Sequence, residues 1–178
     1  MPKLFLTGRP RCGKSSVIQK NLAGLPLSGF AMQRLTRDGE TWAFRLLDLT
    51  QEPDVTHLES DTHWDDIAIS MLTQGKWQGN TQVFENNGRQ SLEKSLSLSR
   101  LVIMDELGIF EREALRFQQT VFNILDSDLP VLGVLKNKHT AFLDQVRAHP
   151  AVVIVEFPGT KAIEMVEALT ARLRRQQP

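Results

Sequence analysis

Short apolar runs alternate with amphipathic stretches along most of the chain. A continuous apolar run bounded by polar residues is typical of a strand that is buried on both faces of a parallel sheet. A stretch whose apolar residues recur every three or four positions is typical of a helix that covers such a sheet. The alternation therefore predicts an α/β fold in three layers, with helices on both faces of a mostly parallel central sheet.

The positions of these patterns give the expected elements. Strands are expected at the apolar runs 3–7, 101–104, 131–135 and 152–155. Helices are expected at residues 14–23, 111–126, 141–149 and from residue 161 onwards. The 111–126 helix is expected to bury one face, which carries Ala114, Leu115, Gln118, Val121, Phe122 and Leu125. The last helix has one apolar stripe, made of Ile163, Val166, Leu169 and Leu173.

An antiparallel hairpin is expected next to the parallel strands. Residues 29–36 and 41–48 flank Asp38-Gly39, a dipeptide suited to a tight hairpin turn. In the second run, large and smaller side chains alternate with a period of two, which indicates a strand with one better-buried face. The pattern thus adds a hairpin to the mostly parallel sheet.

The middle of the chain, residues 50–88, has the weakest pattern. A helix is expected at 63–72 and a short strand at 81–85. Gly75, Gly79, Asn80 and the run 86–88 are expected to form loops, because Gly and Asn favour turns.

Composition and charge bound the function without changing this fold class. A length of 178 residues suits a single domain, 1–178. Acidic and basic residues balance at 21 each, so constitutive binding to nucleic acid is not expected. Cys12 is the sole cysteine, which excludes an internal disulfide and a cysteine cluster for zinc. No signal peptide or membrane-spanning apolar run is recognised, so a cytoplasmic location without membrane contact is expected by default.

The segment Gly8-Arg9-Pro10-Arg11-Cys12-Gly13-Lys14-Ser15 matches the phosphate-binding pattern G-x-x-x-x-G-K-[ST] at every fixed position. It follows an expected strand and opens an expected helix, which is the context that the pattern requires. Its glycines let backbone N–H groups turn inward onto phosphate oxygens, and the helix adds its positive end. Lys14 is then expected to reach the β- and γ-phosphates, and the Ser15 hydroxyl to ligate Mg²⁺. The sequence therefore predicts binding of ATP or another nucleoside triphosphate with Mg²⁺.

A second motif lies at the end of the strand expected at 101–104. That apolar run is followed by Asp105 and Glu106. In doubly wound sheets the carboxyl ends of the strands are where ligands bind, so Asp105 is expected to hold Mg²⁺ directly or through water. A carboxylate just beyond the metal ligand can accept a proton from a water aligned with the γ-phosphate, and Glu106 is the candidate for this role.

The two motifs, in this order, make the sequence similar to the small P-loop nucleoside-triphosphate phosphatases, the cancer-related nucleoside triphosphatase family. Gly29-Phe30 before the hairpin, the acidic run 105–108 and the run 129–132 also match that family. The resemblance implies slow Mg²⁺-dependent hydrolysis of ATP, GTP and other triphosphates to diphosphate and phosphate. It implies metal binding by Ser15 and Asp105, and water activation by Glu106. It implies phosphate binding by Gly8, Arg9, Pro10, Arg11, Cys12, Gly13, Lys14, Ser15 and Ser16.

Two segments depart from that family's pattern. The family's acidic run continues with a basic residue, Met, Glu and Leu, whereas this chain has Ile109-Phe110-Glu111-Arg112. The family's Asn-Arg-Asp stretch after the last strand is replaced by 156–159, Glu-Phe-Pro-Gly.

Weaker patterns leave the nucleotide base and any catalytic arginine open. Asn137-Lys138 sits where guanine-specific enzymes carry Asn-Lys-x-Asp, but position 140 is Thr, so no base specificity is implied. The four histidines are scattered, with no ligand spacing for a transition metal. Several arginines are candidates for stabilising the transition state, namely Arg34, Arg37, Arg45, Arg89 and Arg112.

Two alternatives to hydrolysis share the same motifs. A P-loop small-molecule kinase would use the loop and the metal site to transfer phosphate to an acceptor, and residues 50–88 are long enough to form an acceptor pocket. That region lacks the arginines that such kinases usually carry in a mobile lid, and Glu106 beside Asp105 favours water as the acceptor. In the second alternative, bound nucleotide sets the shape of a surface for a protein partner, which the sequence does not identify.

Overall fold

A computed structural model describes residues 3–98 and 100–176. Its helices and strands follow one another in this order: β1 (Lys3–Thr7), α1 (Lys14–Asn21), β2 (Leu27–Arg37), β3 (Glu40–Asp48), β4 (Leu58–Glu59), β5 (Ile67–Met71), β6 (Trp77–Gly79), α2 (Thr81–Val83), the π-helical turn η1 (Phe84–Gly88), α3 (Arg89–Leu96), β7 (Leu101–Leu107), α4 (Leu115–Asp126), β8 (Val131–Leu135), α5 (Ala141–Ala148), β9 (Val152–Glu156) and α6 (Thr160–Arg175). No helix within these described ranges has the length and apolar character needed to cross a membrane.

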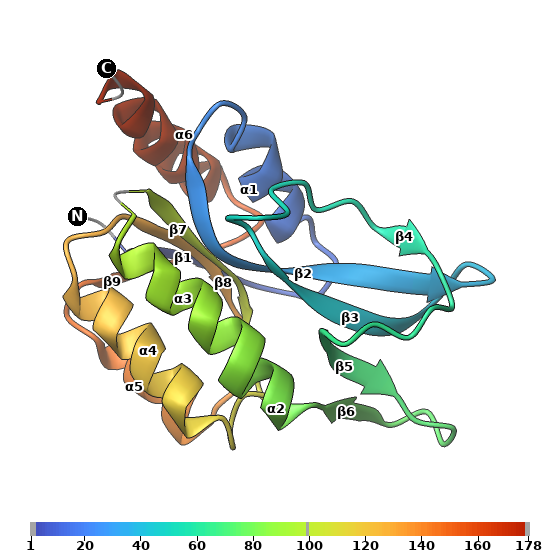
Figure 1. Ribbon diagram of the computed structural model, residues 1–178. Helices are drawn as coiled ribbons and strands as arrows, with labels where there is room; N and C mark the ends of the chain where they lie inside the picture. The colour runs from blue at the N-terminus through green and yellow to red at the C-terminus, as the bar shows by residue number, and fades with distance from the viewer. Residues whose placement is uncertain (1–2, 99, 177–178) are drawn as a thin grey trace.

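The described strands form one nine-stranded sheet in the order β6-β5-β3-β2-β7-β8-β1-β9, with β4 paired to β2 (Figure 1). Strands β2, β7, β8, β1 and β9 are parallel to one another. Strands β3, β5 and β6 join antiparallel at one side. The α/β class and the mostly parallel sheet expected from the sequence are confirmed. Strand β8 lies between β7 and β1, so the two strands that carry the nucleotide motifs are not neighbours.

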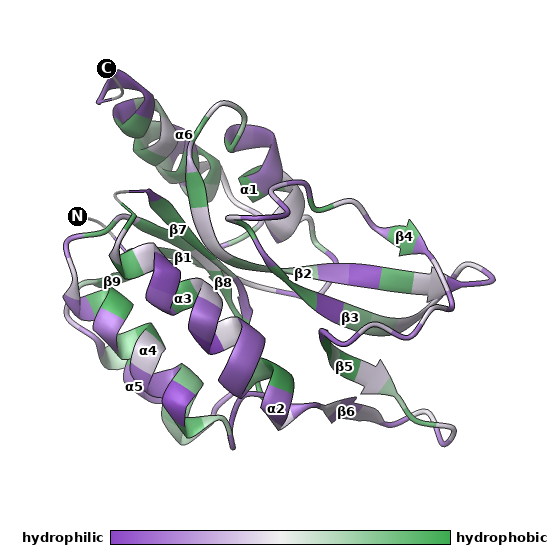
Figure 2. Ribbon diagram, viewed as in Figure 1, coloured by the Kyte–Doolittle hydropathy of each residue, from purple (hydrophilic) through white to green (hydrophobic). Residues whose placement is uncertain are grey.

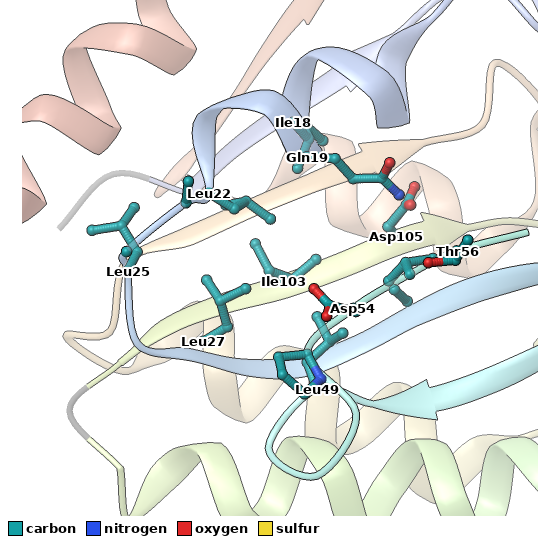
Figure 3. A pocket seen from close by; sticks show the side chains of 15 residues that line it. Ile18, Gln19, Leu22, Leu25, Leu27, Leu49, Asp54, Thr56, Ile103 and Asp105 are labelled. Atoms are coloured by element: carbon teal, nitrogen blue, oxygen red, sulfur yellow. The ribbon is translucent and has the colours of Figure 1, made fainter.

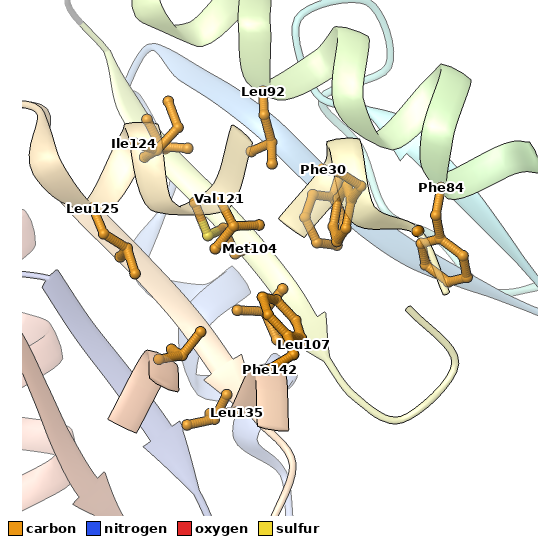
Figure 4. Close-up of a cluster of buried hydrophobic side chains, with 14 of the residues drawn as sticks. Phe30, Phe84, Leu92, Met104, Leu107, Val121, Ile124, Leu125, Leu135 and Phe142 are labelled. Atoms are coloured by element: carbon orange, nitrogen blue, oxygen red, sulfur yellow. The ribbon is translucent and has the colours of Figure 1, made fainter. Parts of the chain in front are cut away.

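Two hydrophobic cores lie on opposite faces of the sheet, and they make the three layers. On one face, α3, α4 and α5 pack through Leu92, Val121 and Phe142 (Figure 4). On the other face, α1 and α6 pack through Ile18 and Val166. The central strands β7 and β8 are mostly apolar, whereas the helices carry hydrophilic residues on their outer sides (Figure 2).

The expected hairpin is confirmed in β2 and β3. Asp38 and Gly39 form its turn with φ values of 52° and 77°, the left-handed region that tight hairpin turns require. Phe30 pairs with Asp48 at the open end and Arg37 with Glu40 at the turn. Because β2 continues well past its last residue paired with β7, Ala31, the hairpin projects beyond the parallel strands.

The prediction of a helix at 63–72 is wrong, since residues 67–71 form strand β5. Large apolar side chains occupy alternate positions there, at Ile67, Ile69 and Met71, which is a strand pattern. Pairing with β3 leaves Ala68 fully buried. The local alternation and the pairing with β3 therefore both favour a strand at 67–71.

The prediction of a strand at 81–85 is also wrong, because 81–96 is a helical segment made of α2, η1 and α3. The Asn80 side chain caps it by accepting a hydrogen bond from the backbone N–H of Gln82 at 3.1 Å. Phe84 and Leu92 are fully buried. A Cβ at Gly88 would come within 3.0 Å of the Phe117 ring, so this glycine permits close helix packing and does not form a loop.

Helix α4 begins at Leu115, four residues later than expected. Its buried face is also rotated from the expected one, because Leu115 is 69% exposed. The side chains that pack on the sheet are Phe117, Thr120, Val121, Ile124 and Leu125. Residues 108–114 instead form a loop that leaves the end of β7 and carries Glu111.

Candidate active site

The phosphate-binding pattern occupies the loop between β1 and α1. Gly13 precedes the helix with φ of 97°, a conformation that favours glycine, and α1 begins at Lys14. The first N–H groups of a helix have no partner within the helix, so this terminus presents donors to an anion. Arg9, Pro10, Arg11 and Ser16 are exposed at the loop and at the helix start. The local fold is thus that of a P-loop.

Lys14 is directed back over the loop that precedes it. Its Nζ donates to the carbonyl oxygen of Gly8 at 3.2 Å and to that of Arg9 at 2.7 Å. The side chain is buried, with 8% of its surface exposed. Lys14 therefore holds its ammonium group at the mouth of the loop, where phosphate oxygens would replace these carbonyl groups as partners.

The structure brings Ser15 and Asp105 together across the sheet. Leu6, Val134 and Asp105 lie side by side on β1, β8 and β7, so β1 and β7 are about 10 Å apart at this level. Helix α1 contacts β8 and spans this gap. The Ser15 hydroxyl donates to Asp105 Oδ1 at 3.0 Å.

Ser15 and Asp105 form a pair of hard oxygen donors that fits Mg²⁺. Mg²⁺ prefers oxygen ligands and is usually held by one or two carboxylates together with substrate phosphates and water. Within 3–98 and 100–176, no group of three or more His, Cys, Asp or Glu side chains is arranged to hold a metal ion. The donor set therefore suits a metal ion that arrives with a phosphate ligand and not one caged by protein alone.

The pKa of Asp105 lies near neutral pH. Burial raises the pKa of Asp105 to about 7, and the charge of Glu106 adds to the rise. The hydrogen bond from Ser15 and the charge of Lys14 act on the same pKa in the opposite direction. A divalent cation beside this carboxylate would favour its ionised form.

Glu106 and Glu111 lie close enough to interact at the end of β7. Glu106 is half-buried, and the peptide bond that joins it to Asp105 is cis. Glu111 is 2% exposed, and both of its carboxylate oxygens accept from the backbone N–H of Gly108 at 3.1 Å. Burial raises the pKa of Glu111 to about 7, and the charge of Glu106 adds to this rise. The hydrogen bonds that the carboxylate accepts and the charge of Lys136 act on the same pKa in the opposite direction. The sequence pattern did not reveal the contact between Glu111 and Gly108, because this contact depends on the loop at 108–114.

The segment after β9 packs under the phosphate-binding loop. Gly8 has φ of 139°, and a Cβ there would lie 2.0 Å from the carbonyl oxygen of Phe157. The thiol of Cys12 lies 3.6 Å from the same oxygen. The residues that stand in place of Asn-Arg-Asp thus support the loop through backbone contact, and no arginine is supplied from this position.

Four of the five candidate arginines contact neighbouring side chains. Arg45 is buried and makes two 2.7 Å hydrogen bonds to Asp66, which fixes it within the hairpin region. The other three contacts are Arg89 with Glu93, Arg37 over the Trp42 ring, and Arg112 with Glu113.

Arg34 differs from these four. Its Nε is buried and has no hydrogen-bond partner among the described residues. It lies three residues beyond Ala31, the partner of Asp105 on β2, which is about 10 Å along the strand. Its backbone N–H donates to His57 Nδ1 at 3.3 Å. Arg34 is therefore the candidate with an uncommitted nitrogen on the strand next to the acidic pair.

Comparisons with known proteins show the family of this chain. A family model described as NTPase matches residues 3–162. The chain belongs to this NTPase family. It is 29% identical over 155 residues to "Nucleoside-triphosphatase THEP1" of Thermotoga sp. (strain RQ2), which covers 86% of this chain and 85% of that protein. It is 24% identical over 139 residues to the protein of the same name from Methanocaldococcus jannaschii, covering 75% and 77% of the two chains.

Two solved structures share the fold. The crystal structure of THEP1 from Aquifex aeolicus superposes with a TM-score of 0.72 at 20% identity, covering 98% of this chain and 100% of that one. The solution structure of a human cancer-related nucleoside triphosphatase superposes with a TM-score of 0.67 at 19% identity, covering 100% of each chain. The family resemblance inferred from the two motifs is confirmed.

Proposed function

We propose that this chain hydrolyses nucleoside triphosphates, ATP and GTP among them, to diphosphate and phosphate in an Mg²⁺-dependent reaction. The hydrogen bond between Ser15 and Asp105 carries the proposal, because it places two oxygen donors beside the helix terminus that would hold the phosphates. Membership of the NTPase family supports the same reaction class.

Each residue has a separate role in the proposed reaction. Lys14 would leave the carbonyl groups of the loop and neutralise charge on the β- and γ-phosphate oxygens. Ser15 and Asp105 would hold Mg²⁺, which when bound supplies positive charge to the phosphate oxygens.

Glu106 would act on water. It stands one residue beyond Asp105 at the strand end, where it would orient a water molecule in line with the γ-phosphorus and accept its proton. The water oxygen forms a bond to the γ-phosphorus, the bond from that phosphorus to the β,γ-bridging oxygen breaks, and the nucleoside diphosphate leaves. Arg34, with its uncommitted Nε, would stabilise charge in the transition state.

Broad tolerance of the nucleotide base is part of the proposal. Asn137 and Lys138 follow β8 and are exposed, and Thr140 caps α5 by accepting from the backbone N–H of Leu143 at 3.2 Å. No carboxylate therefore stands at position 140 to read a guanine edge.

The direct test is phosphate release from ATP, GTP, CTP and UTP, measured with Mg²⁺ and with a chelator. We expect release from all four that requires Mg²⁺ and needs no added acceptor. Tight triphosphate binding without release from any of the four would contradict hydrolysis and favour a kinase or a nucleotide-dependent switch.

A further inference from the structure

Strand β8 lies between the two strands that carry the nucleotide motifs, and Lys136 is the first residue after it. Leu6 on β1 and Asp105 on β7 both pair with Val134 of β8. Lys136, two residues beyond Val134, is therefore at the level where β1 leads into the phosphate-binding loop and β7 leads into the segment after the acidic pair. Because neighbouring strands are about 4.8 Å apart, the backbone of Lys136 lies between these two parts of the site.

The backbone of Lys136 is fixed by hydrogen bonds. Its N–H donates to the carbonyl oxygen of Leu107 at 2.9 Å. Its carbonyl oxygen accepts from Arg147 Nη2 at 2.7 Å and from the N–H of Lys138 at 2.8 Å. These bonds determine where the side chain leaves the end of the sheet.

The side chain of Lys136 runs toward the acidic residues that follow β7. A Cβ added at Gly108 would stand 3.6 Å from Lys136 Cδ and 3.6 Å from Glu111 Oε2, so both side chains pass over this glycine. The positive charge of Lys136 lowers the pKa of Glu111, whereas the negative charge of Glu106 raises it. The ammonium group of Lys136 is therefore on the same side of the loop as the candidate base.

The ammonium group of Lys136 has no direct partner in the part of the chain that the structure describes. The residue is half-buried, and within 3–98 and 100–176 its Nζ makes no hydrogen bond and no ion pair. A lysine ammonium group is a compact point charge with three donors. At the carboxyl end of a central strand, beside the phosphate-binding loop, such a group is placed to donate to a phosphate oxygen.

The cavity on the other side of β7 has no cation in its described lining. This cavity, of about 380 Å³, opens beside Asp105 between α1, β2, β7 and the segment 49–56 (Figure 3), and no Lys, Arg or His is among its described lining residues. Residues 156–159, Glu-Phe-Pro-Gly, bring no cation from β9. A bound triphosphate carries more negative charge than Mg²⁺ and Lys14 together neutralise, and Glu106 adds to it. The end of β8 is therefore the place from which further positive charge reaches the phosphates.

We propose that Lys136 is a second lysine of the phosphate site, whose ammonium group donates to an oxygen of the γ-phosphate. The inference rests on the proposed function, because it assigns a residue to the γ-phosphate of the same substrate. Lys14 spans the β- and γ-phosphates, whereas Lys136 contacts the γ-phosphate alone. While the bond to the β,γ-bridging oxygen breaks, Lys136 remains on the phosphoryl group that is transferred to water and stabilises its charge.

Binding of a triphosphate analogue that resists hydrolysis tests this contact without turnover. In the presence of Mg²⁺, Lys136→Met should bind adenylyl-imidodiphosphate (AMP-PNP) at least tenfold more weakly than the wild type does. Its affinity for ADP, which has no γ-phosphate, should change by less than about twofold. Lys136→Arg keeps the positive charge and should lose less AMP-PNP affinity than Lys136→Met. Isothermal titration calorimetry measures each affinity.

Lys138→Met is the matched control, because this exposed lysine lies on the same connection two residues further on. It should change neither the AMP-PNP affinity nor the ADP affinity. Lys136→Gln, which is polar and uncharged, replaces the methionine variant if that variant fails to fold, and it should lose the same preference for AMP-PNP. Equal weakening of AMP-PNP and ADP binding in either variant would overturn the proposal.

Phosphate release from ATP tests whether the contact acts in the reaction. The kcat of Lys136→Met should fall at least tenfold. Loss of kcat with an unchanged ratio of AMP-PNP to ADP affinity would mean that Lys136 acts through Glu106 or Glu111, and this would overturn the γ-phosphate contact.

The outcomes separate this inference from the proposed function. AMP-PNP binding by the wild type without phosphate release from ATP would contradict hydrolysis, and the affinity ratio would still decide the role of Lys136. Phosphate release with the same affinity ratio in the wild type and Lys136→Met would overturn the role of Lys136 and leave hydrolysis standing. Failure of the wild type to bind AMP-PNP would contradict both.

Discussion

The Ser15 hydroxyl donates a 3.0 Å hydrogen bond to Asp105 Oδ1, although the two residues are 90 positions apart in the sequence. One residue comes from the first turn of α1 and the other from β7, and β8 lies between the strands that lead to them. The contact depends on the whole parallel part of the sheet. It therefore links the integrity of the fold to the assembly of the candidate metal site.

Removing the Ser15 hydroxyl should weaken the metal site selectively. Ser15→Ala removes one proposed Mg²⁺ ligand, whereas Ser15→Thr keeps the hydroxyl. We expect Ser15→Ala to lower Mg²⁺-dependent triphosphate affinity at least tenfold, about 1.4 kcal/mol, and Ser15→Thr to retain most of it. Titration with a fluorescent triphosphate at fixed Mg²⁺ measures both, and equal affinity of the two variants would argue against a ligand role for the hydroxyl.

Adding a methyl group at Gly8 should destabilise the fold around the phosphate-binding loop. The new Cβ would lie 2.0 Å from the Phe157 carbonyl oxygen, at a φ of 139°. Gly8→Ala should lower the free energy of unfolding by about 2–4 kcal/mol in urea.

Gly39→Ala is the matched control for this prediction. Gly39 also has positive φ, at 77°, but an added Cβ would meet no atom within 4 Å. It should cost only about 1 kcal/mol, the price of the backbone conformation. If the two variants lose the same stability, the contact with Phe157 is not the cause.

Glu111 should make stability depend on pH. Burial raises its pKa to about 7 from an ordinary value near 4.5. Between these values the folded state binds more protons than the unfolded state, so this group's contribution to stability is full below about pH 4.5 and is lost as pH rises to 7.

Glu111→Gln removes that titration and keeps an oxygen that can accept from Gly108. At pH 8 the free energy of unfolding should rise by about 1–3 kcal/mol relative to wild type, and near pH 4.5 the two should be similar. Glu113→Gln, at a side chain that is 72% exposed, should show no such difference at either pH. A pH profile of Glu111→Gln that parallels the wild type would contradict the assignment.

Arg34 should contribute to turnover more than to substrate binding. Because its Nε has no partner among the described residues, Arg34→Ala breaks no hydrogen bond at that atom. We expect kcat for phosphate release to fall by 10-fold or more, about 1.4 kcal/mol, with little change in triphosphate affinity. Arg37→Ala, whose guanidinium lies 4.8 Å from the centre of the Trp42 ring, is the control and should keep kcat. An unchanged kcat in Arg34→Ala would remove it from the mechanism.

The parts of the fold that the sequence predicted are those with a local cause. The strands at 3–7 and 131–135 are continuous apolar runs, and Asp38-Gly39 forms its turn from two adjacent residues. The phosphate-binding loop is likewise contiguous. Its residue types alone dictate where the backbone turns and where α1 begins.

The parts that could not be predicted depend on tertiary contacts. The polar run 85–90 contains Asn and Gly, which signal a turn, but it is helical because Phe84 and Leu92 bury against the sheet and α4. Glu111 was expected in the first turn of a helix, yet it folds back onto Gly108 beside Lys136. Neither relationship leaves a periodic signal in the sequence.

The division of roles between Lys14 and Glu106 is tested most directly by measuring triphosphate binding and phosphate release in the same two variants. Lys14→Ala should lose triphosphate binding and, with it, release. Glu106→Gln should bind ATP as the wild type does, while its turnover falls by about 10²–10⁴, the range for loss of a general base. Equal loss of binding in both variants, or wild-type turnover in Glu106→Gln, would contradict the proposed mechanism.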